Sequence, residues 1–298
     1  MEAVQRSEAE LAAKIGATLG EGPVWVERDG CLWSVDIKAP RVHRFDPQSG
    51  QVDGWDAPAE VGWVLPADDG KFVAGLATGL HRFAPDSGAF TLLAETEPHL
   101  PGNRLNDATV DPAGRIWFGS MDNAESGPSG RFYRFDTAGV HLCGIPPCIV
   151  TNGPAVSPDG RTLYVVDTVG RTIDAWTILD GGALAEQRRF VTIAAKDGYP
   201  DGVCVDAEGG VWLGLWGGGA AQRYDRNGVP TDEVRFPVSN VTKVALGGPD
   251  GRTAYATTAR QGLDPTALAG QPFAGDLFTF KVKVPGPPSP EIRLGNTV

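Results

Sequence analysis

Acidic and amide side chains recur at one position of a pattern that the 298-residue sequence repeats six times. The position lies eight residues before a turn glycine, and its occupants in chain order are Gly22, Gly62, Asn106, Asn152, Asp201 and Lys243. Glu21 precedes the first of these residues, and Asp107 follows the third. Carboxylates and amides that gather at one place are costly to bury unless a cation or bound water holds them, so the pattern indicates an ion-binding site.

The donor atoms of three of these residues indicate which ion would bind. Glu21, Asn152 and Asp201 offer only oxygen donors, and neither His nor Cys stands at the repeated position. Such a set suits one hard divalent cation, Ca²⁺, Mg²⁺ or Mn²⁺, with Zn²⁺ and Fe²⁺ as alternatives. Three protein ligands leave room for water and substrate, as Lewis-acid chemistry requires. For each residue alone a structural role is the alternative, because Asn and Asp often end strands by bonding their own backbone.

The elements that must position these side chains are short hairpins. Six segments place an apolar strand, a glycine turn and a second apolar strand in succession, and their turn glycines are Gly30, Gly70, Gly114, Gly160, Gly209 and Gly251. Glycine supplies the positive φ that such turns need. A second signature, such as VHRFDPQSG or FYRFDTAG, follows each hairpin and predicts a third strand, a turn and a returning fourth strand.

Units of about 40–45 residues with four strands are typical of propeller blades. The sequence therefore predicts an all-β fold, a six-bladed β-propeller with four antiparallel strands per blade. We expect one domain over residues 1–298, in which residues 1–16 form an N-terminal segment of acidic, helix-favouring composition. A β-sandwich with coincidental turns is the alternative, but it would not produce six matched pairs of signatures.

A propeller would bring the six repeated positions together. The first strand of each blade lines the central channel, so these positions converge at the channel mouth opposite the glycine turns. Two long loops, residues 121–130 and 259–275, are expected on the same face. Because long loops on a rigid scaffold usually carry function, we expect the site at this mouth.

Composition and charge disfavour several other classes of protein. A net charge of −11 disfavours binding to nucleic acid or to anionic membranes. The sequence lacks a run of 18 apolar residues and an apolar signal segment at its start, so we expect a cytoplasmic protein with no membrane span. We expect a monomer whose four cysteines are reduced. The motifs G-x-S-x-G, H-E-x-x-H and G-x-x-x-x-G-K-[ST] do not occur.

Four ordered motifs resemble the family of regucalcin (senescence marker protein), gluconolactonases and luciferin-regenerating enzymes. They are LGEGPVW with Glu21, NRLND with Arg104, Asn106 and Asp107, TNGPAVSPDG with Asn152, and PDGVCVDAEG with Asp201. The resemblance extends from about Ala17 to Arg293, and it is strongest to bacterial sugar lactonases of the xylonolactonase and arabinolactonase kind. It implies a six-bladed propeller with one divalent cation.

The resemblance also implies roles for individual residues in a small-molecule reaction. Glu21, Asn152 and Asp201 would bind the cation, and Asp201 would also act as the general base. Arg104 and Asn106 would contact a sugar lactone, as would Asp107 and, in the lid loop, Glu125. The implied reaction is hydrolysis of a pentono- or hexonolactone to the aldonic acid in sugar catabolism.

The alternatives to this function are a calcium-binding protein without turnover and a hydrolase of other esters. The roles of two residues also stay open at this stage. Asp107 is either a second acid or base or a hydrogen-bond partner of Arg104. Lys243 either contacts the substrate or pairs with a nearby carboxylate.

Overall fold

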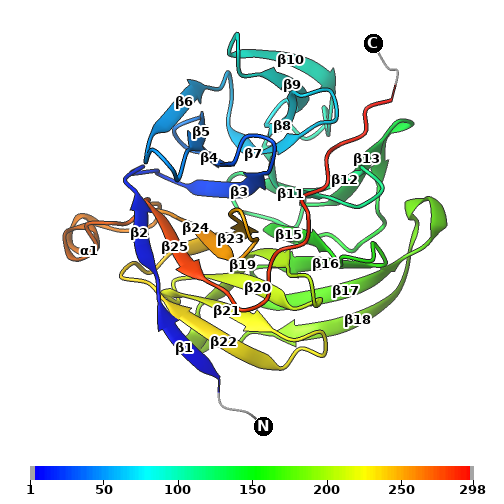
Figure 1. Ribbon diagram of the computed structural model, residues 1–298. Helices are drawn as coiled ribbons and strands as arrows, with labels where there is room; N and C mark the ends of the chain where they lie inside the picture. The colour runs from blue at the N-terminus through cyan, green and yellow to red at the C-terminus, as the bar shows by residue number, and fades with distance from the viewer. Residues whose placement is uncertain (1–3, 296–298) are drawn as a thin grey trace.

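The computed structural model describes residues 4–295, and six β-sheets surround a central channel in it (Figure 1). Blade one contains β3 (Gly20–Val26), β4 (Cys31–Asp36), β5 (Arg41–Phe45) and β6 (Val52–Asp56). Blade two contains β7 (Val61–Pro66), β8 (Phe72–Leu76), β9 (Gly79–Ala84) and β10 (Ala89–Ala94). Blade three contains β11 (Asn103–Val110), β12 (Ile116–Asp122), β13 (Phe132–Asp136) and β14 (Gly139–Leu142).

The remaining three blades follow in chain order around the ring. Blade four contains β15 (Thr151–Val156), β16 (Thr162–Asp167), β17 (Thr172–Ile178) and β18 (Leu184–Thr192). Blade five contains β19 (Tyr199–Val205), β20 (Val211–Trp216), β21 (Ala220–Tyr224) and β22 (Pro230–Arg235). Blade six contains β23 (Val241–Gly247), β24 (Thr253–Thr258) and β25 (Leu277–Lys281). The short helices are η1 (Asp180–Gly182), η2 (Ala195–Asp197) and α1 (Pro265–Gly270).

The predicted six-bladed propeller with four antiparallel strands per blade is confirmed. In each blade the strands that follow one another along the chain pair in antiparallel register. All six predicted turn glycines have positive φ, between 61° at Gly30 and 82° at Gly70, Gly114 and Gly209. Each of the six glycine turns predicted from the sequence therefore lies in one of the six blades.

The N-terminal residues form strands rather than the helix that their composition favours. β2 (Glu10–Ala13) pairs antiparallel with β25 and supplies the fourth strand of blade six. β1 (Gln5–Glu8) pairs in parallel with β22 and adds a fifth strand to blade five, and both strands lie at the left of Figure 1. Two sheet edges would otherwise expose unpaired backbone groups, and pairing with them overrides the local helix propensity.

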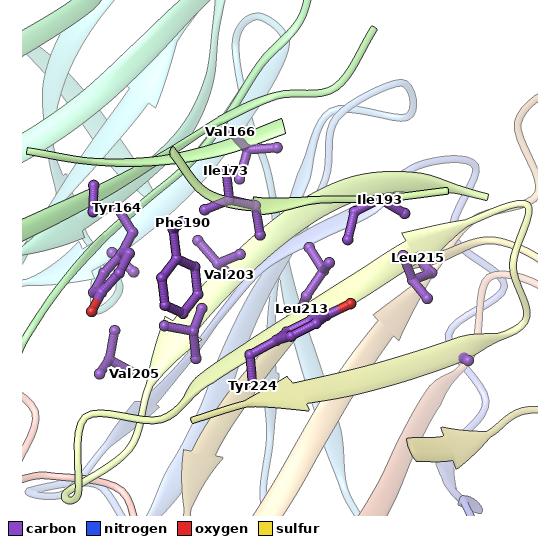
Figure 2. Close-up of a cluster of buried hydrophobic side chains, with 14 residues drawn as sticks. Tyr164, Val166, Ile173, Phe190, Ile193, Val203, Val205, Leu213, Leu215 and Tyr224 are labelled. Atoms are coloured by element: carbon purple, nitrogen blue, oxygen red, sulfur yellow. The ribbon is translucent and has the colours of Figure 1, made fainter. Parts of the chain in front are cut away.

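The hydrophobic core lies between neighbouring blades. Figure 2 shows one such layer, in which Val166 and Ile173 of blade four lie near Val203, Leu213 and Leu215 of blade five. These side chains are at most 1 % exposed. Each blade therefore buries both of its faces against its neighbours, and the ring fixes the orientation of every first strand.

The inner strands carry an irregularity at the position where the sequence placed the polar residues. In all six, the register with the second strand shifts there, for example between Glu21 and Val24 and between Asn152 and Ala155. Such β-bulges re-aim side chains that a regular strand would alternate strictly. A Cβ on Gly62 would lie 2.5 Å from the carbonyl oxygen of Asn106, so glycine there allows the inner strands to approach closely.

The C-terminal residues 283–295 cross the middle of the ring on the face of the glycine turns, and Figure 1 shows them in red. This segment is called the strap below. Its backbone bonds to turns of blades five, six, two and three through Pro285, Gly286, Ile292 and Arg293. The strap thus covers the channel mouth opposite the predicted site.

Two further predictions concern the cysteines and the membrane. Cys31, Cys143, Cys148 and Cys204 all have free thiols, as expected. Within residues 4–295, every helix is too short or too polar to cross a membrane.

Candidate active site

A cavity of about 410 Å³ opens at the channel mouth away from the glycine turns. Six of the residues singled out from the sequence line it: Glu21, Arg104, Asn106, Glu125, Asn152 and Asp201. They come from blades one, three, four and five, so the ring brings together residues that are far apart in the chain. The structure thus gathers the predicted ligands and most of the predicted substrate contacts in one place.

A chain of hydrogen bonds orders the amide side of the cavity. Arg104 donates from Nη1 to Oδ1 of Asn106 (2.6 Å) and from Nε to Oδ1 of Asn123 (3.0 Å). Asn106 Nδ2 donates to the Thr151 carbonyl oxygen (2.6 Å) and to Oδ1 of Asn152 (3.0 Å). Asn152 Nδ2 in turn donates to Oγ1 of Thr168 (2.9 Å), which leaves the Asn152 oxygen on the acceptor side.

Two carboxyl groups form the acidic side of the cavity. Glu21 and Asp201 are only 4 % and 5 % exposed. Burial raises the pKa of Glu21 to about 8, and the nearby charge of Asp107 adds to the rise. Burial also holds the pKa of Asp201 well above its usual value, with Glu21 as the next cause. Since the charge of Glu21 makes Asp201 harder to ionise, a cation bound beside them would relieve the repulsion.

The donor set fits a hard divalent cation. Residues 4–295 hold no cluster of three or more His, Cys, Asp or Glu side chains suited to a metal, so a third protein ligand beside Glu21 and Asp201 would be an amide oxygen. Asn152 offers that oxygen in the same cavity as the two buried carboxyl groups. Oxygen donors without sulfur or imidazole suit Ca²⁺, Mg²⁺ or Mn²⁺.

Asp107 and Lys243 lie apart from the cavity and form a buried ion pair. Lys243 Nζ donates to Asp107 Oδ1 (2.6 Å) and to the Ala108 carbonyl oxygen (3.2 Å). The Asp107 side chain is 1 % exposed, and its Oδ2 finds no hydrogen-bond partner among residues 4–295. Lys243 lines a second cavity, of about 400 Å³, towards the strap. Of the alternatives left open by the sequence, Lys243 pairs with a carboxylate, and the partner of Asp107 is Lys243 rather than Arg104.

The predicted lid loop carries Glu125 to the cavity. Asp122 orders this loop by accepting hydrogen bonds from the backbone N–H groups of Ala124 (3.0 Å) and Ser126 (2.9 Å). Glu125 itself has a φ of 53°, a backbone conformation that few residues other than glycine adopt. Contacts within the loop itself therefore determine its conformation beside the cavity.

Sequence reasoning missed the apolar and aromatic part of the lining. Tyr199, Trp216 and Gly262 line the cavity together with Leu19, Met121, Val150, Thr168, Val169 and Gln261. One signal was available, because Tyr199 stands only two residues before Asp201 on the same inner strand. The position of Trp216 depends on strand register, which the repeat alone does not give.

The fold and the cavity together define a six-bladed propeller with an acidic and amide-lined binding site at one mouth of its channel. The chain belongs to the SMP-30/gluconolactonase/LRE-like family, whose sequence profile matches residues 19–260. The resemblance noted in the sequence is thereby confirmed.

Individual relatives are similar over nearly their whole length. An L-arabinolactonase of Azospirillum brasilense is 37 % identical over 283 residues, which cover 94 % of this chain and 93 % of the relative. A pentonolactonase of Haloferax volcanii is 33 % identical, with 93 % and 96 % covered. The crystal structure of a protein described as a calcium-binding regucalcin of Agrobacterium tumefaciens superposes with a TM-score of 0.93 at 30 % identity, covering 99 % of this chain and 100 % of that one.

Proposed function

We propose that this protein hydrolyses a sugar aldonolactone, a pentono- or hexonolactone, to the aldonic acid, and that a divalent cation is required. The observation that carries the proposal is the cavity, which two buried carboxyl groups line together with a hydrogen-bonded network of one arginine and two amides. Relatives named L-arabinolactonase and pentonolactonase support an enzyme that acts on cyclic esters of this class.

The chemistry of the substrate explains the polar half of the cavity. An aldonolactone is a neutral ring with several hydroxyl groups and one ester carbonyl. Arg104, held by Asn106 and Asn123, presents a fixed guanidinium that would orient the carbonyl or a hydroxyl oxygen. Glu125 stands at the rim of the same cavity and would accept a hydrogen bond from a hydroxyl group. Holding the substrate in the reactive orientation in this way lowers the entropic part of the activation barrier, which is a large contribution to catalysis in general.

The cation would be held by Glu21, Asn152 and Asp201, and when bound it supplies Lewis-acid polarisation of an oxygen atom. Asp201 is proposed as the general base that takes a proton from the attacking water at its carboxylate. Its carboxyl group lines the cavity in which the water and the lactone would meet, as a general base requires. The attacking water forms a bond to the carbonyl carbon, the bond from that carbon to the ring oxygen breaks, and the Asp201 carboxyl group gives its proton to the leaving ring oxygen.

The test is proton release from a panel of sugar lactones, measured with and without EDTA and after metals are restored one at a time. We expect metal-dependent hydrolysis of at least one pentono- or hexonolactone. Asp201→Asn should lower kcat by about 10²- to 10⁴-fold, the usual contribution of a general base. Asp86→Asn, in an exposed turn, is the matched control and should keep wild-type turnover.

Two outcomes would contradict the proposal. Hydrolysis that never exceeds the spontaneous rate, together with tight metal binding, would favour the binding protein without turnover. Hydrolysis of aryl esters in preference to every sugar lactone would favour the other ester hydrolase.

A further inference from the structure

Two aromatic side chains form one wall of the cavity. Tyr199 begins β19 and Trp216 ends β20, and the two residues are direct partners in the antiparallel register. Directly opposed residues of such a pair project from the same face of the sheet. Both rings line the cavity beside Asp201, and they are called the aromatic wall below.

Tyr199 is the one aromatic residue among the exposed large hydrophobic side chains of residues 4–295. Tyr199 is 40 % exposed, although it lines the cavity that holds the buried carboxyl groups. Trp216 is half-buried and packs against the core cluster that contains Leu19 and Ala259. The wall is therefore anchored in the core but remains open to whatever occupies the cavity.

Arg171 holds the tyrosine ring from outside the cavity. Its guanidinium lies 3.7 Å from the centre of the Tyr199 ring and also donates a hydrogen bond to the carbonyl oxygen of Gly198. Arg171 belongs to the turn between β16 and β17 of blade four, has a φ of 58°, and is not among the described residues that line the cavity. A cation over one face of an aromatic ring fixes the ring and leaves the other face free.

We propose that the aromatic wall binds the C–H face of the sugar lactone ring by stacking, and that it selects the closed ring over the open-chain product. The inference rests on the proposed function. A lactone is a compact ring with hydrogens on carbon that can lie flat against an aromatic face, whose π-cloud is electron-rich. The polar groups of Arg104 and Glu125 would then meet the hydroxyl groups at other sides of the same cavity.

Ring opening removes the flat surface that the wall recognises. The aldonate product is a flexible chain, so it would lose more conformational entropy on stacking than the ring does. The wall would therefore lower KM for the lactone while contributing little to product affinity. This difference separates a substrate-stacking role from a merely structural one.

The experiment compares Tyr199→Leu, Trp216→Leu and the double variant with the wild type. Leucine keeps an apolar side chain but removes the aromatic face. We measure kcat, KM for the best lactone of the panel, and the inhibition constant of the matching aldonate. Stacking on an aromatic face stabilises binding by more than the burial of apolar area alone. Each single variant should therefore raise KM about two- to tenfold, and the double variant fivefold or more. The aldonate inhibition constant should change less than about twofold.

Controls keep the outcome interpretable. Tyr199→Phe retains the ring and should restore KM, and Leu142→Ala, at an exposed site on β14, should leave all constants unchanged. If the double variant fails to fold in a thermal scan, Tyr199→Leu alone decides. The inference is overturned if KM rises less than fivefold in the folded double variant, or less than twofold where Tyr199→Leu alone decides. It is also overturned if KM and the aldonate inhibition constant rise equally. A wild type that hydrolyses no lactone would instead overturn the proposed function.

Discussion

Lys243 is a buried cation on an inner strand, and it lies near the buried carboxyl groups of other inner strands. Its ammonium group lies 2.6 Å from Asp107, and its charge lowers the pKa of Glu21, Asp107 and Asp201 against the stronger effect of burial. Arg104 is the second buried cation near these acids. Three buried carboxyl groups thus share two fixed cations, which is consistent with a site that binds one more positive ion.

Lys243→Met should destabilise the protein strongly. The substitution leaves the Asp107 carboxylate buried, with one oxygen atom already without a partner. Removing one partner of a buried ion pair typically costs about 3–5 kcal/mol, because the remaining charge is uncompensated. Urea unfolding followed by circular dichroism measures the loss in the free energy of unfolding.

The double variant Lys243→Met/Asp107→Asn is the control for that prediction. It removes the charge as well as its partner, so it should recover most of the lost stability. A single variant that loses less than about 1 kcal/mol, or a double variant no more stable than the single one, would show that the pair does not matter for folding.

At the scale of the strands, the six inner strands combine a bulge with close approach to their neighbours. Gly62 occupies the repeat position that Asn106 holds in the next blade. A Cβ there would lie 2.5 Å from the Asn106 carbonyl oxygen and 2.7 Å from that of Leu105, both of them backbone atoms that cannot rotate away. The glycine therefore fixes the distance between β7 and the strand that carries Arg104 and Asn106.

Gly62→Ala should impair both folding and catalysis. The added methyl group forces β7 and β11 apart, and overpacking of this kind typically costs about 1–3 kcal/mol. The shift also moves Asn106 and with it the guanidinium of Arg104, so kcat/KM should fall about tenfold or more even where the variant is folded. Thermal unfolding and lactone hydrolysis at 25 °C measure the two effects.

Gly270→Ala provides the comparison, because a Cβ at the end of α1 meets no atom within 4 Å. It should leave kcat/KM unchanged and should not lower stability, because alanine favours a helix more than glycine does. If Gly62→Ala behaved like Gly270→Ala, the close approach of the inner strands would have no functional meaning.

The strands that the sequence predicts are those whose signals are local. Glycine turns such as Gly114 and Gly160 are read directly, because positive φ is a property of single residues. The strands β1 and β2 are not predictable in this way, since they form only against the distant edges of β22 and β25. Local composition favours a helix there, but pairing with strands near the other end of the sequence makes these residues β-strands.

The same distinction applies to the candidate site. Glu21, Asn152 and Asp201 could be placed together because Asn152 and Asp201 occupy the repeat position and Glu21 directly precedes it. Trp216 could not, because its position in the cavity follows from the register of β20 with β19. Asp107 pairs with Lys243 instead of lining the cavity, because the bulge between Leu105 and Ala108 changes the direction in which consecutive side chains project.

On the scale of the whole molecule, both ends of the chain close the ring. β2 completes blade six beside blade one, and the strap joins turns on the opposite face. Within the strap, Ile292 exchanges backbone hydrogen bonds with Pro66 and Asp68 of blade two, and Glu291 pairs with Arg28 of blade one at 2.6 Å. The blades are therefore held together at positions that are far apart in sequence, and no described residue of the strap lines the active-site cavity.

Ile292→Ala should lower stability without lowering activity. The Ile292 side chain is fully buried in the core cluster that contains Leu65 and Ile116, so its truncation should cost about 2–5 kcal/mol. Lactone hydrolysis at 25 °C should stay within about twofold of the wild type while the variant remains folded, which corresponds to about a few tenths of a kcal/mol. The reason is that the cavity lies at the other channel mouth. Pro288→Ala, at an exposed residue of the strap, should keep the wild-type unfolding temperature. An unchanged free energy of unfolding for Ile292→Ala would mean that the strap only covers the channel, whereas a tenfold loss of kcat/KM in the folded variant would show that the two mouths are coupled.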